Sequence, residues 1–138
     1  MERSEEPDRA AAYAALRKQL EPYARPDARK AIGQVINTFL PYAALWALMI
    51  HMIRQDYPIG WFLAPILLAA LLMVRIFIIF HDCTHGSFFK SHRANRLLGY
   101  LCGVLTLTPF ESWRRAHTIH HATWADLDRR DLGAIWTL

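Results

Sequence analysis

The sequence predicts an all-α membrane protein built around one transmembrane helical hairpin. Hydrophobic residues make up 54% of its 138 residues, and only three of its 28 charged residues lie between residues 31 and 80. A soluble fold of this length does not normally leave 50 consecutive residues with so few charges. No segment shows the alternation typical of a β-strand. With only Cys83 and Cys102, the chain is also no disulfide scaffold.

The first 30 residues predict a polar N-terminal arm. They carry 13 charged residues of both signs, and apolar residues at helical spacing indicate a short amphipathic helix from about Asp8 to Leu20. Pro22 follows this pattern and should end the helix. A signal peptide is excluded, because the arm has no apolar core segment. We expect residues 1–30 to form a cytoplasmic arm.

Two apolar stretches predict the transmembrane hairpin. Residues 32–53 contain no charge, and residues 59–80 contain only Arg75. Each stretch has the roughly 20 residues that a helix needs to cross a hydrocarbon core of about 30 Å. Arg75 lies five residues before the end of the second stretch, so its side chain can extend toward the lipid headgroups.

The basic residues predict the orientation of this hairpin. Seven Lys and Arg residues precede the first span, seven follow the second, and only Arg54 lies in the connecting turn. Because basic residues concentrate on the cytoplasmic side of a membrane, both ends of the chain should be cytoplasmic. The basic residues flank apolar segments instead of forming a stripe, so we expect anionic lipid, and no nucleic acid, as their partner.

The rest of the chain predicts two further helical segments. Residues 97–110 are apolar but too few to span a membrane, and they include Gly99, Gly103 and Pro109. We expect an interfacial or re-entrant helix there. Residues 111–138 are polar and should form a cytoplasmic segment with a histidine-bearing helix.

Five of the seven histidines fall into two clusters at this cytoplasmic side. His81 and His85 are four residues apart, and His117 has the same relation to His121 and lies three residues before His120. Residues with these spacings share one face of a helix. Neutral imidazole is a good ligand for zinc, copper, iron and nickel, so the two clusters predict a metal site.

Spacing alone leaves three kinds of metal site open. A zinc hydrolase would use HExxH, whereas this chain has HDCTH, with Asp82 at the glutamate position. Haem ligation would favour single histidines on facing helices. An oxygen-activating nonhaem iron centre would use many neutral ligands near a membrane surface, which suits the two clusters.

The two histidine clusters resemble the histidine boxes of a known family. The segments HDCTHGSFF (81–89), Asn95 and LTPFESWRRAHTIHHATWADLDRRD (107–131) are similar to those of the integral membrane fatty acid desaturases. The resemblance covers roughly residues 35–138. It implies that residues 31–138 form part of a desaturase domain, which uses dioxygen to introduce a double bond into the acyl chain of a membrane lipid or other acyl substrate.

The resemblance also implies a di-iron centre supplied with electrons by a ferredoxin or a b-type cytochrome. By this comparison the iron ligands are His81, His85, His117, His120 and His121. Asp82 would orient a ligand imidazole from outside the iron coordination sphere. Trp113, Arg114 and Arg115 match the run before the second box, where an interfacial anchor explains them.

Family members also have a third histidine box after a second hairpin, and the 138 residues contain neither. The resemblance therefore implies an incomplete ligand set and a chain that is inactive alone. Two alternatives stay open: a noncatalytic membrane remnant or assembly partner, and a related di-iron hydroxylase.

Overall fold

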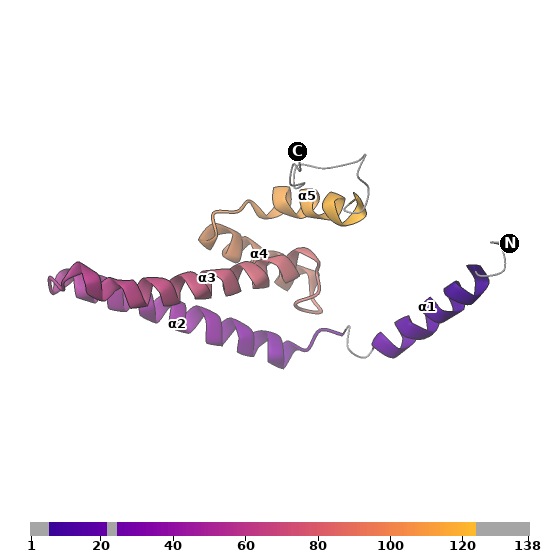
Figure 1. Cartoon of the computed structure of the whole chain (residues 1–138), viewed down its shortest axis with the longest axis horizontal. Coiled ribbons are helices and arrows are strands. Elements are labelled where there is room, and N and C mark those ends of the chain that lie inside the picture. Colours follow the sequence, from indigo (N-terminus) through magenta and orange to yellow (C-terminus); the bar gives the residue numbers. More distant parts are fainter. Residues whose placement is uncertain (1–5, 22–24, 124–138) are drawn as a thin grey trace.

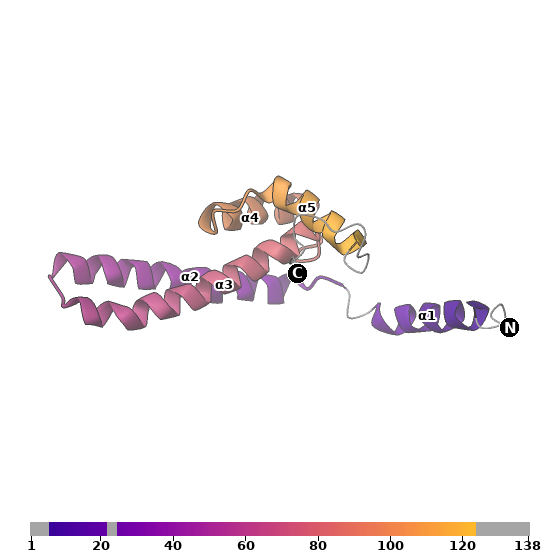
Figure 2. The same cartoon turned by 45° about the horizontal axis from the view of Figure 1, so that its top comes forward.

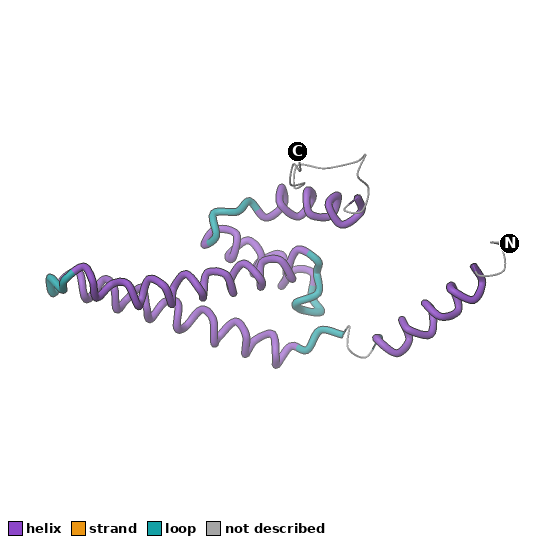
Figure 3. Tube along the Cα trace, viewed as in Figure 1, coloured by secondary structure: helices purple, strands orange, loops and turns teal. Residues whose placement is uncertain are grey.

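The computed structural model describes residues 6–21 and 25–123, and within these ranges every regular element is helical (Figure 3). This confirms the predicted all-α class. In chain order the elements are α1 (Glu6–Leu20), α2 (Ala28–Arg54), the 3₁₀ helix η1 (Ile59–Phe62), α3 (Leu63–Thr84), α4 (His92–Leu105) and α5 (Phe110–Thr123).

The helices α2 and α3 lie side by side and antiparallel in both views of the chain (Figures 1 and 2). Both are long and apolar enough to cross a membrane. Asp27 caps the start of α2 by accepting hydrogen bonds from the backbone N–H groups of Arg29 and Lys30. The predicted second span, 59–80, is η1 plus most of α3, and α3 continues to Thr84. The first histidine cluster therefore lies on the hairpin helix itself.

Large apolar side chains cover the outside of the hairpin. Leu40 and Leu71 are each 65% exposed, and Val74 is 59% exposed. The core helix of a soluble protein would bury such side chains, because water contact with apolar surface costs free energy. This surface therefore suits contact with hydrocarbon.

A polar contact crosses the hairpin at Arg75. Its guanidinium donates a hydrogen bond of 2.8 Å from Nη2 to Asn37 Oδ1 on α2. Next to this pair, Thr38 and Ile76 are fully buried between the two helices. The arginine thus has a protein partner in the hairpin, which hydropathy alone did not suggest.

The predicted boundaries of the third apolar segment were wrong. Instead of one helix over 97–110, α4 begins at His92 and ends at Leu105, and Phe110 belongs to α5. The Ser91 hydroxyl caps α4 by accepting a hydrogen bond from the Ala94 N–H. The helix therefore begins at His92, earlier in the chain than predicted. The turn after α4 takes Leu107 into the left-handed region (φ 53°), which ends the helix.

The α4–α5 turn folds α5 back over α4 and the end of α3 (Figures 1 and 2). Two glycines on one face of α4 permit this approach. A Cβ at Gly99 would collide with the Phe110 ring, and one at Gly103 would lie 2.6 Å from the Thr108 carbonyl oxygen. Phe80, which is fully buried, contacts Phe110 edge-on at a centroid distance of 5.7 Å. This packing joins the two histidine-bearing helices.

The N-terminal helix α1 stands apart from the hairpin in both views (Figures 1 and 2). Its extent, Glu6–Leu20, is close to the predicted one, and its apolar residues Tyr13 and Leu16 are exposed. At the other end, α5 ends at Thr123. The predicted polar stretch 126–131 lies outside the described residues.

Candidate metal centre

Four of the five predicted histidines converge on one point. His81 and His85 come from the end of α3, and His117 and His121 come from α5. One nitrogen of each imidazole lies within 4.8 Å of the corresponding nitrogen of the other three. The two boxes, 32 residues apart between His85 and His117, thus form one site.

The Nε2 atoms have the spacing of ligands around a metal ion. His117 Nε2 lies 3.0 Å from that of His81, 3.1 Å from that of His85 and 3.0 Å from that of His121. The His81 and His85 Nε2 atoms are 3.3 Å apart. Nitrogens about 2.0–2.1 Å from one ion lie about 2.9 Å apart at right angles and about 3.4 Å apart in a tetrahedron. These four distances fall in this interval, and the other two pairs lie within 4.8 Å.

The end of α3 is shaped by a glycine. Gly86 has φ 68°, a conformation in which a side chain is strained, and its N–H donates to the Cys83 carbonyl. The His85 N–H donates to the His81 carbonyl. The helix thus ends within the first box: His81 lies in its last turn, and His85 is its C-cap residue.

Asn95 holds the loop that follows this helix end. It is 2% exposed, and its amide donates to the Gly86 and Phe89 carbonyl oxygens while its Oδ1 accepts from the Phe89 N–H. These bonds satisfy backbone groups that the loop would otherwise leave unpaired. From the sequence, Asn95 belongs to the family resemblance only, and its polar neighbours in HRANR give no signal of a buried role.

The Asp82 carboxylate contacts the first histidine of the cluster. Its Oδ1 lies 3.2 Å from His81 Nδ1. A proton on Nδ1 would be donated to this carboxylate, which would leave the Nε2 lone pair directed toward the other imidazoles.

Trp113 supports the second box. Its ring stacks on His117 with a centroid distance of 4.2 Å and an interplanar angle of 23°. It also meets Phe80 edge-on at 5.1 Å and His81 at 5.9 Å. From the sequence Trp113 had only an interfacial role, although its i, i+4 spacing to His117 could have indicated the stacking. Its contacts with Phe80 and His81 depend on α5 folding over α3.

Burial and the neighbouring imidazoles favour the neutral form of His85 and His117. Partial burial and then the neighbouring imidazoles, His81 first, lower the pKa of His117 to about 4. Burial and then His81 and His121 also lower the pKa of His85. Only neutral imidazole binds a metal, so both residues are ready to act as ligands at neutral pH.

The fifth predicted histidine, His120, does not belong to the convergent group of four. Its ring centroid lies 6.1 Å from that of His117 and 6.0 Å from that of His121. Adjacent residues on a helix point about 100° apart, so His120 and His121 cannot direct their rings at the same point.

Comparison with known proteins agrees with this geometry. The sequence profile described as fatty acid desaturase matches residues 57–135, which contain all five clustered histidines. The chain belongs to the fatty acid desaturase family.

Curated desaturases match the chain over much of its length. A fatty acid desaturase of Bacillus subtilis (strain 168) is 46% identical over 123 residues, which are 89% of this chain and 34% of the relative. The sn-1 acyl-lipid omega-3 desaturase (ferredoxin) of Synechocystis is 39% identical over 50% of this chain and 20% of the relative. The acyl-lipid omega-3 desaturase (cytochrome b5) of Arabidopsis thaliana is 33% identical over 67% of this chain and 23% of the relative.

The chain thus spans about a third of the length of the Bacillus relative, and less of the other two. No solved structure matches it.

Proposed function

We propose that this chain supplies part of the iron centre of a fatty acid desaturase, an oxidoreductase that uses dioxygen to introduce a double bond into an acyl chain. The observation that carries the proposal is the convergence of four imidazole Nε2 atoms at the end of an apolar hairpin. Without an ion, the Nε2 atoms of these imidazoles can share N–H···N hydrogen bonds, with donor and acceptor set by the tautomer. With an ion, the same arrangement becomes a coordination sphere.

The donor set fits iron. Imidazole is a ligand that iron accepts readily, and the neutral state of His85 and His117 is the one required. When bound, iron would supply the redox chemistry with dioxygen that removes two hydrogens from an unactivated acyl chain. A zinc hydrolase is favoured less, because the Asp82 carboxylate contacts His81 and is thereby occupied as a positioning group.

The proposal also covers two residues outside the group of four, the substrate and the electron donor. Asp82 holds the Nδ1 proton of His81 and so orients its Nε2 atom. His120, which stands beside the group of four, is a ligand for a second iron whose other ligands this part of the fold does not supply. The acyl group of a membrane lipid is the substrate, and a ferredoxin or b-type cytochrome is the electron donor, as the names of two relatives suggest.

The proposed location is a membrane, crossed by α2 and α3 with both chain ends cytoplasmic. The exposed apolar surface of the hairpin supports the crossing. The orientation rests on the basic residues, which concentrate before α2 and after α3 and leave only Arg54 at the hairpin turn. The histidine centre would then face the cytoplasm.

Metal analysis of the purified protein tests the iron site. We expect iron to bind the wild type, and His81→Ala, His85→Ala or His121→Ala to reduce the bound iron strongly. His51→Ala is the matched control, because His51 is an exposed histidine at the opposite end of the hairpin. Unchanged iron content in the cluster variants would contradict the proposal. If zinc but not iron restored activity to the metal-free protein, the hydrolase would be favoured.

Lipid profiling of cells that express the chain separates binding from catalysis. New unsaturated acyl chains would show desaturation by the chain itself, and hydroxylated chains would indicate the related hydroxylase. Iron binding without either product would indicate a noncatalytic partner that contributes ligands only.

A further inference from the structure

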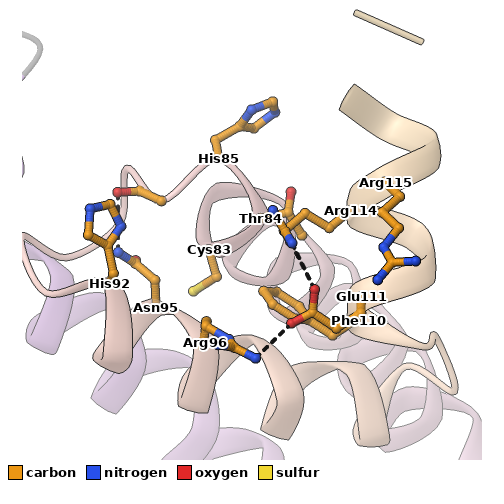
Figure 4. Close-up of a pocket in the computed structure, with 11 residues that line it drawn as sticks. Cys83, Thr84, His85, His92, Asn95, Arg96, Phe110, Glu111, Arg114 and Arg115 are labelled. Atoms are coloured by element: carbon orange, nitrogen blue, oxygen red, sulfur yellow. Dashed lines mark hydrogen bonds and ion pairs between the residues drawn. The ribbon is translucent and has the colours of Figure 1, made fainter. Parts of the chain in front are cut away.

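A pocket of about 570 Å³ lies beside the histidine cluster, between the end of α3, α4 and the first turns of α5 (Figure 4). His85 stands at its edge and is the only one of the four convergent histidines that lines it. The pocket is therefore a neighbour of the metal site and a separate space.

The pocket is strongly basic. Arg96 from α4 and Arg114 and Arg115 from α5 line it, against the single carboxylate of Glu111. Asp and Lys are absent from its lining, so its charged side chains sum to two positive charges. Such a concentration of guanidinium groups favours an anion.

Glu111 holds two of these arginines in place, as Figure 4 shows. Arg96 Nη2 lies 3.1 Å from Glu111 Oε1, and Arg114 donates to Oε2 from Nε at 3.2 Å and from Nη2 at 2.9 Å. Tyr100 donates to Oε1 at 2.9 Å. Each guanidinium has five N–H donors, so both arginines keep donors beyond those that Glu111 uses.

Arg115 adds a charge that no carboxylate among the described residues pairs with. In the part of the chain that the structure describes, it makes no hydrogen bond or ion pair. Three guanidinium groups around one pocket, two of them fixed and one available, match the bidentate hydrogen bonding that arginine makes with phosphate.

The exposed face of α4 indicates which phosphate can reach the pocket. Leu97, Leu101 and Val104 follow the spacing of one helix face and are 72%, 50% and 72% exposed. An apolar face that no part of the described chain covers suits the hydrocarbon side of a membrane surface. Arg96 directly precedes Leu97, so contact of this apolar face with a membrane surface would place the pocket near the lipid headgroups.

We infer that Arg96, Arg114 and Arg115 form a binding site for the phosphate of a lipid headgroup, next to the histidine cluster. The site would hold a phospholipid at the membrane surface beside the metal centre. The inference concerns binding alone, so it can fail while the proposed iron chemistry stands, and the reverse.

Binding to three soluble probes tests the site and its source of phosphate. The purified full chain, in an uncharged detergent, is titrated with dihexanoyl phosphatidylglycerol, with dihexanoylglycerol, which lacks the phosphate, and with glycerol phosphate, which lacks the acyl chains. We expect the phospholipid to bind the wild type at least about tenfold more tightly than dihexanoylglycerol, because a charge-assisted hydrogen bond is worth about a factor of ten or more. It should also bind more tightly than glycerol phosphate, because only the phospholipid has acyl chains that can contact the apolar face of α4.

Substitutions locate the binding. Arg115→Gln decides the test, since Arg115 makes no hydrogen bond or ion pair within residues 6–21 and 25–123, and Arg96→Gln is the second variant. Both should weaken phospholipid binding about tenfold, whereas Arg93→Gln should not, because Arg93 is an exposed arginine on α4 outside the pocket. Helical content and iron binding should be unchanged in Arg115→Gln.

Two results would overturn the inference: equal phospholipid binding by Arg115→Gln and the wild type, or equal binding of dihexanoylglycerol and the phospholipid. If glycerol phosphate binds as tightly as the phospholipid and depends on the same arginines, the phosphate site is supported and the lipid source is overturned.

Discussion

The two histidine boxes are held in place by different physical means. The first, at the end of α3, is held by polar contacts: the left-handed Gly86, the buried amide of Asn95 and the Asp82 carboxylate. The second, on α5, is held by aromatic packing of Trp113. Hydrogen bonds fix the orientation of the groups they join, whereas ring stacking fixes the distance between rings and excludes water. Substitutions at the two boxes should therefore have different measurable effects.

His117 is the point at which the two boxes meet, and its loss should have the largest effect. Its Nε2 atom is within 3.1 Å of three other imidazole Nε2 atoms. We expect His117→Ala to weaken iron binding more than about a hundredfold, beyond the usual effect of losing an outer-sphere partner. Iron titration measures this. A loss no larger than that of a Trp113 variant would contradict the convergent geometry.

The polar contacts that hold the first box predict that Asn95→Ala is less stable than the wild type. This change leaves the Phe89 N–H and the Gly86 carbonyl without their partner in a buried place. The free energy of unfolding should fall by about 1–3 kcal/mol, measured by denaturation in detergent. Ser87→Ala is the control, because it removes one exposed hydrogen bond. Equal stability of the two variants would mean that Asn95 does not hold the loop.

The aromatic packing that holds the second box predicts a smaller effect of changing Trp113, seen mainly in metal affinity. An aromatic pair contributes about 0.5–1.5 kcal/mol, so Trp113→Leu should weaken iron binding about two- to tenfold. Trp113→Phe keeps a ring against His117 and should retain most of the affinity. If the two variants bind iron equally, stacking has no part in positioning His117.

The smallest predicted effect is the pH dependence of the metal-free protein. Because the pKa of His117 is lowered to about 4, the unfolded chain binds a proton between pH 6.5 and 4 that the folded chain does not. Stability should therefore fall as the pH falls through this window, and a thermal midpoint measured at pH 7.5 and pH 5 should show it. Partial exposure of the imidazole keeps the effect small. The same pH slope in His117→Gln would contradict this assignment.

Features that depend on local sequence were predictable, whereas contacts between helices were not. Hydropathy and charge are summed along the chain, so the hairpin and the arm helix were predicted close to their observed extents. The start of α4 was missed although Ser91 is a recognisable cap. Helix geometry separates the rings of His120 and His121. Which of the two joins the convergent group depends on where α5 lies over α3.

The sequence by itself determined the helical class, the apolar hairpin, the family and the histidines available as ligands, because each depends on residue type and local spacing. The tertiary structure alone decided that His81, His85, His117 and His121 share one point, and that Trp113 on α5 meets Phe80 and His81 on α3. It also decided that Arg96 on α4 reaches Glu111 on α5. These contacts join α3, α4 and α5, and their formation depends on the close approach that Gly99 and Gly103 permit, which local spacing does not encode.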